Sequence, residues 1–258
     1  MTARILEKLM QIEHDFGVKI LLAVESGSRA WGFDSPDSDF DVRFIYVHPV
    51  DWYLKVLPQS DTIEYMSDDH LLDFSGWELR KALQLLRKTN PNLSDWLLTD
   101  KVYLADKDFL HDIRAAQDAH YNPIHGIYHF FNIARKHDEA NLIKKGYTLK
   151  RFLYFMRGLL ACEYIMQHNC HPPVCFVELV EATIVDIRIK DYLYQLLDLK
   201  RRSKESDNVV VASELVDYTY TIYHRLLQML DDFRPVVDLP DASVLDSLLQ
   251  NCVKGISH

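Results

Sequence analysis

Apolar residues over Ala3–Phe16 recur every three to four positions, a spacing that predicts an amphipathic helix. The next apolar run, Lys19–Glu25, is continuous and strand-sized, which indicates a buried strand. A second long strand is predicted over Asp39–Val47, and shorter strands are predicted over Thr62–Met66 and Leu71–Phe74. The stretch between the first two strands is rich in Gly, Ser, Asp and Pro, so it predicts turns.

Helical spacing dominates the rest of the chain. Gly76 is expected to open a helix that Asn90-Pro91 ends. Beyond Phe109 the strand signal nearly disappears, and the predicted helices include Leu149–Gln167, Val174–Ala182, Ile184–Leu199 and Ala212–Asp232. The pattern predicts an α+β fold class, with an α/β domain containing a small mixed sheet over 1–105 and an all-helical domain over 106–258.

Composition places the chain among ordinary globular proteins, with 258 residues of which 48% are hydrophobic. The formal net charge of −9 argues against broad binding to nucleic acid, although a local basic patch remains compatible with it. No apolar run approaches the roughly 20 residues that cross a bilayer, so we expect no membrane partner. With no secretory segment visible, we expect a cytoplasmic protein whose four cysteines are reduced.

Asp39 and Asp41 stand two positions apart where the second long strand begins. Strand geometry turns both carboxylates to one face and points Phe40 and Val42 to the other, into a core. Adjacent carboxylates repel each other and usually need a cation between them. Ligands that are all oxygen favour Mg²⁺, which also takes phosphate oxygens of a substrate.

Gly27 and Ser28 follow the first long strand directly. A glycine there permits a tight turn and the close approach of a ligand to the backbone. Backbone N–H groups and the Ser28 hydroxyl are suited to holding phosphate oxygens. Gly-Ser and Asp-x-Asp are each weak signals alone, but their order, with a run of turn residues between two strands, predicts a phosphate cradle facing a metal site.

This arrangement resembles the signature of the DNA polymerase β-like nucleotidyltransferase superfamily, and the chain looks closest to its RNA-repair-associated group. Leu72–Leu83, Asn90-Pro91 and Pro172-Pro173 also look like that group. The resemblance implies two Mg²⁺ ions and a third carboxylate on a neighbouring strand. Asp73 is the best match for it, with Glu64 and Glu78 as alternatives, and it would accept a proton from the attacking hydroxyl.

One position departs from the pattern of some relatives, which carry a phosphate-contacting arginine three residues after the signature serine. Trp31 stands at that position here. Arg29 is the candidate substitute, although an ion pair with Asp34 or Asp37 is an equal alternative. Ser38 is a further candidate for a phosphate contact, weighed against a simple turn serine.

The resemblance also implies that the helical domain closes the nucleotide cleft. Lys150 is the candidate for a phosphate contact from that domain, because it opens a long helix and follows Lys144 and Lys145. Two other groups have weak metal-site spacing. His125 and His129 lack a third partner, and Cys170-His171 with Cys175 lack a fourth, so we expect no metal at either.

The expected reaction moves a nucleoside monophosphate from a nucleoside triphosphate, ATP first among them, to a hydroxyl acceptor and releases pyrophosphate. The acceptor is an RNA end, a protein side chain or a small molecule. An RNA end is favoured by the resemblance, whereas transfer to protein would make the chain an AMPylator. A silent nucleotide-binding or antitoxin-like module is the alternative outside enzymes, and the Asp39/Asp41 pair argues against it.

Overall fold

The computed structural model describes residues 1–138, 147–202, 208–231 and 239–255. Its contacts divide the chain into two compact units. The first unit consists of 1–30, 39–121 and 239–258, and the second of 31–38 and 122–238. The chain therefore enters the second unit twice, once through a short loop and once through a long helical segment.

A five-stranded mixed sheet is the centre of the first unit, which confirms the predicted α+β class. Its strands in spatial order are β3 (Thr62–Met66), β4 (Leu72–Glu78), β2 (Phe40–Val47), β1 (Lys19–Glu25) and β5 (Val102–Ala105). Strands β2 and β4 run parallel, and the other neighbours are antiparallel. The parallel pair brings the beginnings of β2 and β4 to the same edge of the sheet.

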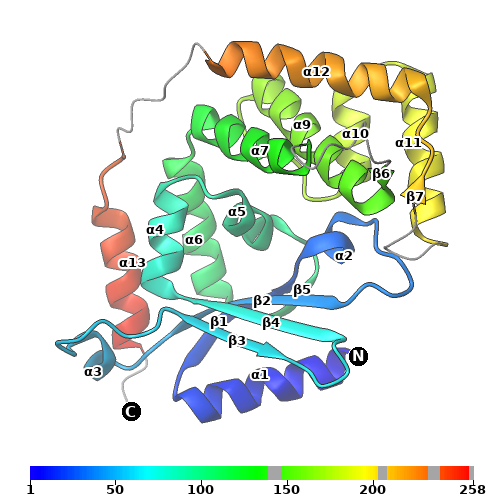
Figure 1. Cartoon of the computed structure of the whole chain (residues 1–258). Coiled ribbons are helices and arrows are strands. Elements are labelled where there is room, and N and C mark those ends of the chain that lie inside the picture. Colours follow the sequence, from blue (N-terminus) through cyan, green and yellow to red (C-terminus); the bar gives the residue numbers. More distant parts are fainter. Residues whose placement is uncertain (139–146, 203–207, 232–238, 256–258) are drawn as a thin grey trace. The chain divides into compact units, whose positions relative to one another are not determined.

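Helices cover both faces of this sheet (Figure 1). On one face, α1 (Thr2–Phe16) buries its apolar side against residues such as Val42 and Phe44. The opposite face is covered by α4 (Leu79–Arg87), α5 (Pro91–Leu98), α6 (Lys107–His120) and α13 (Ser243–Lys254). Val42 thus points into a core as predicted, and alternation along β2 turns Asp41 and Arg43 to the face opposite α1.

The first unit reaches beyond the expected 1–105 segment, because it also holds α6 and α13. Phe109 and Ile113 of α6 share one buried cluster with Leu245 and Leu248 of α13. Strand residues such as Val24 belong to the same cluster. The periodicity of an amphipathic helix reveals its apolar side but not the core that this side joins, so the sequence placed both helices in the helical part.

The predicted helix start at Gly76 is wrong, since β4 continues to Glu78 and α4 begins at Leu79. The Glu78 carboxylate caps α4 by accepting a hydrogen bond from the Arg80 N–H. Gly76 instead lies in the middle of the strand, where a Cβ would come within 2.2 Å of the Phe44 ring. A close side-chain approach, and not a helix start, explains this glycine.

Two short helices complete the first unit's connections, α2 (Gly27–Trp31), whose last residue falls in the second unit, and α3 (Val50–Tyr53).

The second unit is mainly helical, as predicted. Its described helices are α7 (Pro123–Asp138), α9 (Leu149–His168), α10 (Phe176–Thr183), α11 (Ile187–Lys200) and α12 (Ser213–Asp231). A minimal sheet joins β6 (Tyr147–Thr148) to β7 (Asn208–Val209).

The loop 31–38 is packed within the second unit by aromatic and polar contacts. Phe33 is fully buried and contacts the rings of Tyr154 and Phe176 at centroid distances of 5.9 and 5.5 Å. The buried Lys200 amine donates to the Ser35 hydroxyl at 2.9 Å. The segment between Gly-Ser and Asp-x-Asp is therefore an ordered part of a helical core and not a free turn.

Candidate active site

Gly27 and Asp41 lie directly against each other. The Ser26 N–H donates to the Asp41 carbonyl at 2.9 Å, which joins the end of β1 to the start of β2. Gly27 has a φ of 59°, and a Cβ on it would lie 2.1 Å from Asp41 Oδ2. Only glycine fits here, because any other side chain would be strained and would collide with the carboxylate. The predicted close approach at Gly27 is thus made by a carboxylate of the protein itself.

Asp73 lies beside Asp41, because these two residues are register partners in the parallel pair of β2 and β4. Asp73 is the second residue of its strand, so the two carboxylates meet where both strands begin. Glu78, an alternative third carboxylate, is instead occupied by capping α4 and by the Tyr53 hydroxyl at 2.5 Å. Glu64, the other alternative, is exposed on β3 opposite Ser75.

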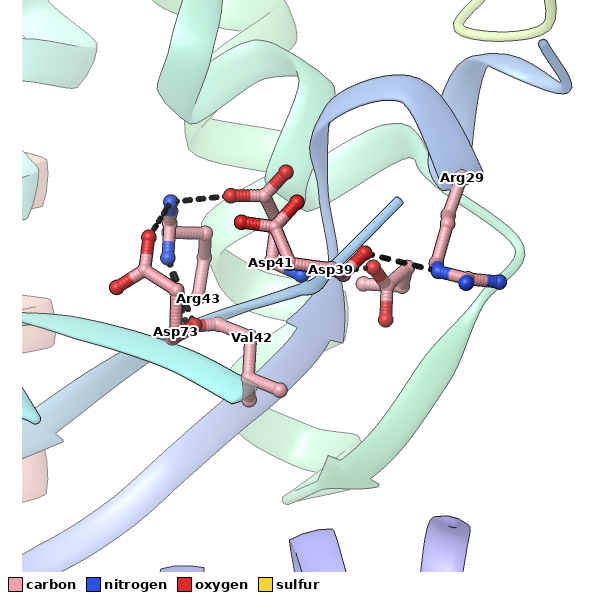
Figure 2. Close-up of polar contacts among 7 residues, drawn as sticks. Arg29, Asp39, Asp41, Val42, Arg43 and Asp73 are labelled. Atoms are coloured by element: carbon pink, nitrogen blue, oxygen red, sulfur yellow. Dashed lines mark hydrogen bonds and ion pairs between the residues drawn. The ribbon is translucent and has the colours of Figure 1, made fainter. Parts of the chain in front are cut away.

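The guanidinium of Arg43 lies between the two carboxylates (Figure 2). Its Nη2 donates to Asp41 Oδ1 at 2.6 Å and to Asp73 Oδ2 at 2.8 Å. Its Nη1 donates to the Asp73 carbonyl at 3.0 Å and, more weakly, to the Val42 carbonyl at 3.3 Å. The side chains of Arg43, Asp41 and Asp73 are 18%, 22% and 29% exposed, so this ion-pair network is only partly screened by water.

Glu25 is a third carboxylate at this end of β1, and it is almost fully buried. One oxygen accepts from the Asp41 N–H at 3.0 Å, and the other accepts from the Tyr103 hydroxyl. Burial raises the pKa of Glu25 to about 6, against the opposing effect of these hydrogen bonds. Glu25 therefore fixes the backbone that carries Asp41.

The sequence patterns did not predict a role at the site for Arg43 or Glu25. Alternation along β2 places Arg43 on the face of Asp41, and that was a usable signal. Glu25 ends an otherwise apolar strand immediately before Gly27, and a carboxylate at such a position is an exception to ordinary burial. Neither signal identifies the partners on other strands, which are Asp73 of β4 for Arg43, and Tyr103 of β5 and the Asp41 N–H of β2 for Glu25.

Arg29 contacts the segment that carries Asp39. Its Nε donates to the Asp39 carbonyl at 2.9 Å (Figure 2). Its guanidinium also lies 3.9 Å from the centre of the Phe40 ring. Asp39 itself stands one residue before β2. The Arg29 side chain thus reaches the beginning of β2, and a phosphate contact by it stays a prediction.

The two candidate serines are buried. Ser28 is 4% exposed within α2. The Ser38 hydroxyl lies 2.9 Å from that of Ser35 and accepts from the Ser35 N–H at 3.0 Å. Ser38 therefore closes a turn in the loop of the second unit, and the structure brings it together with Ser35 and Lys200.

Lys150 and Trp31 belong to the second unit. Lys150 lies in the first turn of α9, which Thr148 caps, and its amine is 6.0 Å from the centre of the Tyr154 ring. Trp31 packs edge-on against Tyr154, and the Arg157 guanidinium stacks 4.2 Å from the indole. Lys144 and Lys145 lie outside the described residues.

The carboxylates around Arg43 are suitable ligands for a divalent cation. In the part of the chain that the structure describes, no three His, Cys, Asp or Glu side chains are gathered closely enough to hold a metal together. Asp41 and Asp73 nevertheless aim one oxygen each at a single positively charged nitrogen. Mg²⁺ is commonly held by one or two carboxylates, with water and substrate phosphates as its other ligands, so this pair fits it.

Comparisons with known proteins identify the family to which the chain is similar. The family model RlaP, described as the RNA repair pathway DNA polymerase beta family, matches residues 1–250. The uncharacterized protein YcgL of Bacillus subtilis (strain 168) is 37% identical over 257 residues, which cover 99% of this chain and 98% of that protein.

A crystal structure of a nucleotidyltransferase-like protein from Exiguobacterium sibiricum 255-15 shares 14% identity, with a TM-score of 0.35 over 85% of this chain and 73% of the other. None of the helices in the described ranges is long and apolar enough to cross a membrane.

Proposed function

Since the chain belongs to the RNA repair pathway DNA polymerase beta family, we propose that it is a Mg²⁺-dependent nucleotidyltransferase that uses ATP. The observation that carries the proposal is that the carboxylates of Asp41 and Asp73 converge on the Arg43 guanidinium beside Gly27. Two convergent carboxylates beside a helix start with Gly27 and Ser28 provide what a metal-bound triphosphate needs, namely anionic metal ligands and backbone N–H groups for phosphate oxygens.

Each predicted residue has a role in this proposal. Asp41 and Asp73 are the metal-binding carboxylates that already converge, Asp39 would join them as the third when the metal binds, and Asp73 accepts the proton of the attacking hydroxyl. The phosphates are held by Gly27, Ser28, Arg29, Ser38 and Lys150. Mg²⁺ supplies charge stabilisation to the transferring phosphoryl group when it is bound. Asp39 would complete the ligand set from its place one residue before β2.

The proposed acceptor is the hydroxyl of an RNA end. The family description names an RNA repair pathway, which favours this acceptor over a protein or a small molecule. A net charge of −9 is compatible with contacts to a short terminus and disfavours a long nucleic-acid track. The attacking hydroxyl would displace pyrophosphate in line from the α-phosphate.

A labelling experiment tests this function. The protein is incubated with each α-³²P-labelled nucleoside triphosphate, Mg²⁺ and short RNAs that end in a 3′-hydroxyl, a 3′-phosphate or a 5′-hydroxyl. We expect ATP-derived label on RNA with a free hydroxyl, and equimolar release of pyrophosphate. Label on protein alone would move the acceptor to a side chain. Binding of triphosphate without any pyrophosphate release would favour the silent module.

A further inference from the structure

Arg43 contacts both carboxylates of the proposed metal pair, although the sequence pattern gives it no role. Its Nη2 is 2.6 Å from Asp41 Oδ1 and 2.8 Å from Asp73 Oδ2. The parallel register of β2 and β4 pairs Asp41 with Asp73, and Arg43 follows Asp41 by two residues in β2. The three side chains are therefore held on one face of the sheet. The guanidinium is therefore built into this position by the strands and does not reach it from a flexible loop.

A metal ion that bridges the two oxygens contacted by Nη2 would take the place of that nitrogen. Mg²⁺ binds carboxylate oxygens at about 2.0–2.1 Å, which is inside the space that Nη2 now fills. A divalent ion beside an arginine would also place like charges in contact at a site only partly open to water. Occupation by one cation thus excludes occupation by the other.

We propose that Arg43 is the resident counter-ion of the Asp41–Asp73 pair, which it stabilises in the metal-free protein and leaves when a divalent cation binds. The inference rests on the proposed function, since it takes this pair to be the metal site. After release, the guanidinium also gives up two carbonyl acceptors, those of Asp73 and Val42. Its side chain is 18% exposed, so water can replace those contacts.

The proposal has two measurable consequences. Arg43 competes with the metal, so it weakens the affinity of the nucleotide-free protein for divalent cations. It also neutralises two carboxylates that repel each other, so it stabilises the fold when no metal is present. A residue that only positioned the two ligands would do the opposite to affinity, because its removal would weaken metal binding.

The test is Mn²⁺ binding measured by electron paramagnetic resonance of the free ion, without nucleotide, on the full chain. The variants are Arg43→Gln and Arg4→Gln. Arg4 forms another arginine–aspartate pair in the same unit, with Asp69 at 2.7 Å, so its substitution changes net charge equally. We expect Arg43→Gln to bind Mn²⁺ about tenfold or more tightly than wild type, and Arg4→Gln to stay within a few-fold.

Thermal unfolding in EDTA provides the second readout. Arg43→Gln is expected to lower Tm by about 2–4 °C or more, and added Mn²⁺ should raise its Tm by more than it raises that of the wild type. If Arg43→Gln does not fold, Arg43→Lys retains one charge without the two-pronged geometry. It should then show an affinity above that of wild type.

The outcomes separate this inference from the proposed function. Equal or weaker Mn²⁺ binding by Arg43→Gln, with clear binding by wild type, overturns the counter-ion role and leaves the metal site intact. Failure of wild type, Arg43→Gln and Arg43→Lys to bind Mn²⁺ at millimolar concentration overturns both. Tighter Mn²⁺ binding by Arg43→Gln that disappears in the double variant Arg43→Gln/Asp41→Asn supports both the counter-ion role and the metal site.

Discussion

At the scale of single residues, Gly27 and Asp41 form the most restrictive contact of the site. The positive φ of Gly27 and the carboxylate packed over its Cα both exclude a side chain. Gly17 has nearly the same φ, 60°, but apart from its own chain neighbours no described residue has an atom within 4 Å of the position that its Cβ would take. The two glycines therefore separate backbone strain from the collision with Asp41.

Gly27→Ala should destabilise the protein more than Gly17→Ala does. Strain at positive φ costs about 1–2 kcal/mol in each variant, whereas only Gly27→Ala must also displace Asp41. Urea unfolding of both variants gives the comparison, and nucleotidyl transfer should fall only in Gly27→Ala. Equal losses of stability, with transfer intact in both, would mean that Asp41 moves aside without consequence.

His48 makes the stability of the protein sensitive to acid. Its ring stacks on Trp52 at a centroid distance of 4.3 Å, and burial, with a smaller effect of Lys55, lowers its pKa from 6.5 to about 4. Between these two values the unfolded chain binds more protons than the folded protein does. Stability is therefore lost as the pH falls from about 7 towards 4.

His48→Phe keeps an aromatic ring for stacking and removes the titration. The free energy of unfolding of the wild type, relative to that of this variant, should fall between pH 6.5 and pH 4. Above pH 7.5 the difference in free energy of unfolding between the two proteins should be constant. Urea unfolding across this range measures it. His14→Asn, which replaces an exposed histidine of α1, should retain the acid loss of the wild type. Parallel curves for wild type and His48→Phe would contradict the assignment.

At the scale of elements, the parallel register of β2 and β4 brings Asp41 beside Asp73. The same pair explains Gly76, because Phe44 of β2 occupies the space beside it. The geometry of the candidate site and the packing of the core are thus set by one strand pairing, on its two opposite faces.

Gly76→Ala should destabilise the fold by about 1–3 kcal/mol, since the added methyl group overlaps the Phe44 ring. The double variant Gly76→Ala/Phe44→Leu should lose less stability than the sum of the losses in the two single variants. Chemical unfolding of the four proteins completes the cycle. Strictly additive losses would show that the two positions do not press on each other.

The sequence predicted β1, β2 and β3 closely, because their apolar runs are bounded by turn residues. It also selected Asp73 as the third carboxylate, and the structure lays Asp73 beside Asp41, although a catalytic role stays a prediction. Arg43 was missed, because its second carboxylate, Asp73, comes from a pairing between strands that are separated by a long connection. The extension of β4 past Gly76 was missed because a glycine in a strand and a glycine before a helix look alike in one sequence.

At the scale of the whole molecule, the chain contributes the loop 31–38 to the second unit between two segments of the first. Signature residues Gly27 and Asp41 therefore belong to one unit, while Ser38 belongs to the other. The final helix α13 returns to the first unit and packs Leu245 and Leu248 into its core. Neither unit is formed by one continuous stretch of sequence.

Lys150 of the second unit is predicted to bind a phosphate of the triphosphate. Lys150→Ala should raise the KM for triphosphate and lower kcat, since charge on the departing pyrophosphate loses a partner. Steady-state kinetics tests this. Lys190→Ala, which breaks an ion pair with Glu181 in the same unit, serves as the control. Unchanged kinetics in Lys150→Ala would assign the helix start a purely structural role.

In the proposed function, Asp41 and Asp73 hold the Mg²⁺ that nucleotidyl transfer requires. The most direct measurement is transfer of α-³²P-labelled AMP to an RNA 3′-hydroxyl by Asp41→Asn and Asp73→Asn. The control is Asp69→Asn, which removes an aspartate paired with Arg4 away from the carboxylate pair. We predict a loss of about 100-fold or more in each site variant, near wild-type transfer in the control, and no transfer in EDTA. Transfer by folded Asp41→Asn and Asp73→Asn at more than about a tenth of the wild-type rate would contradict the claim.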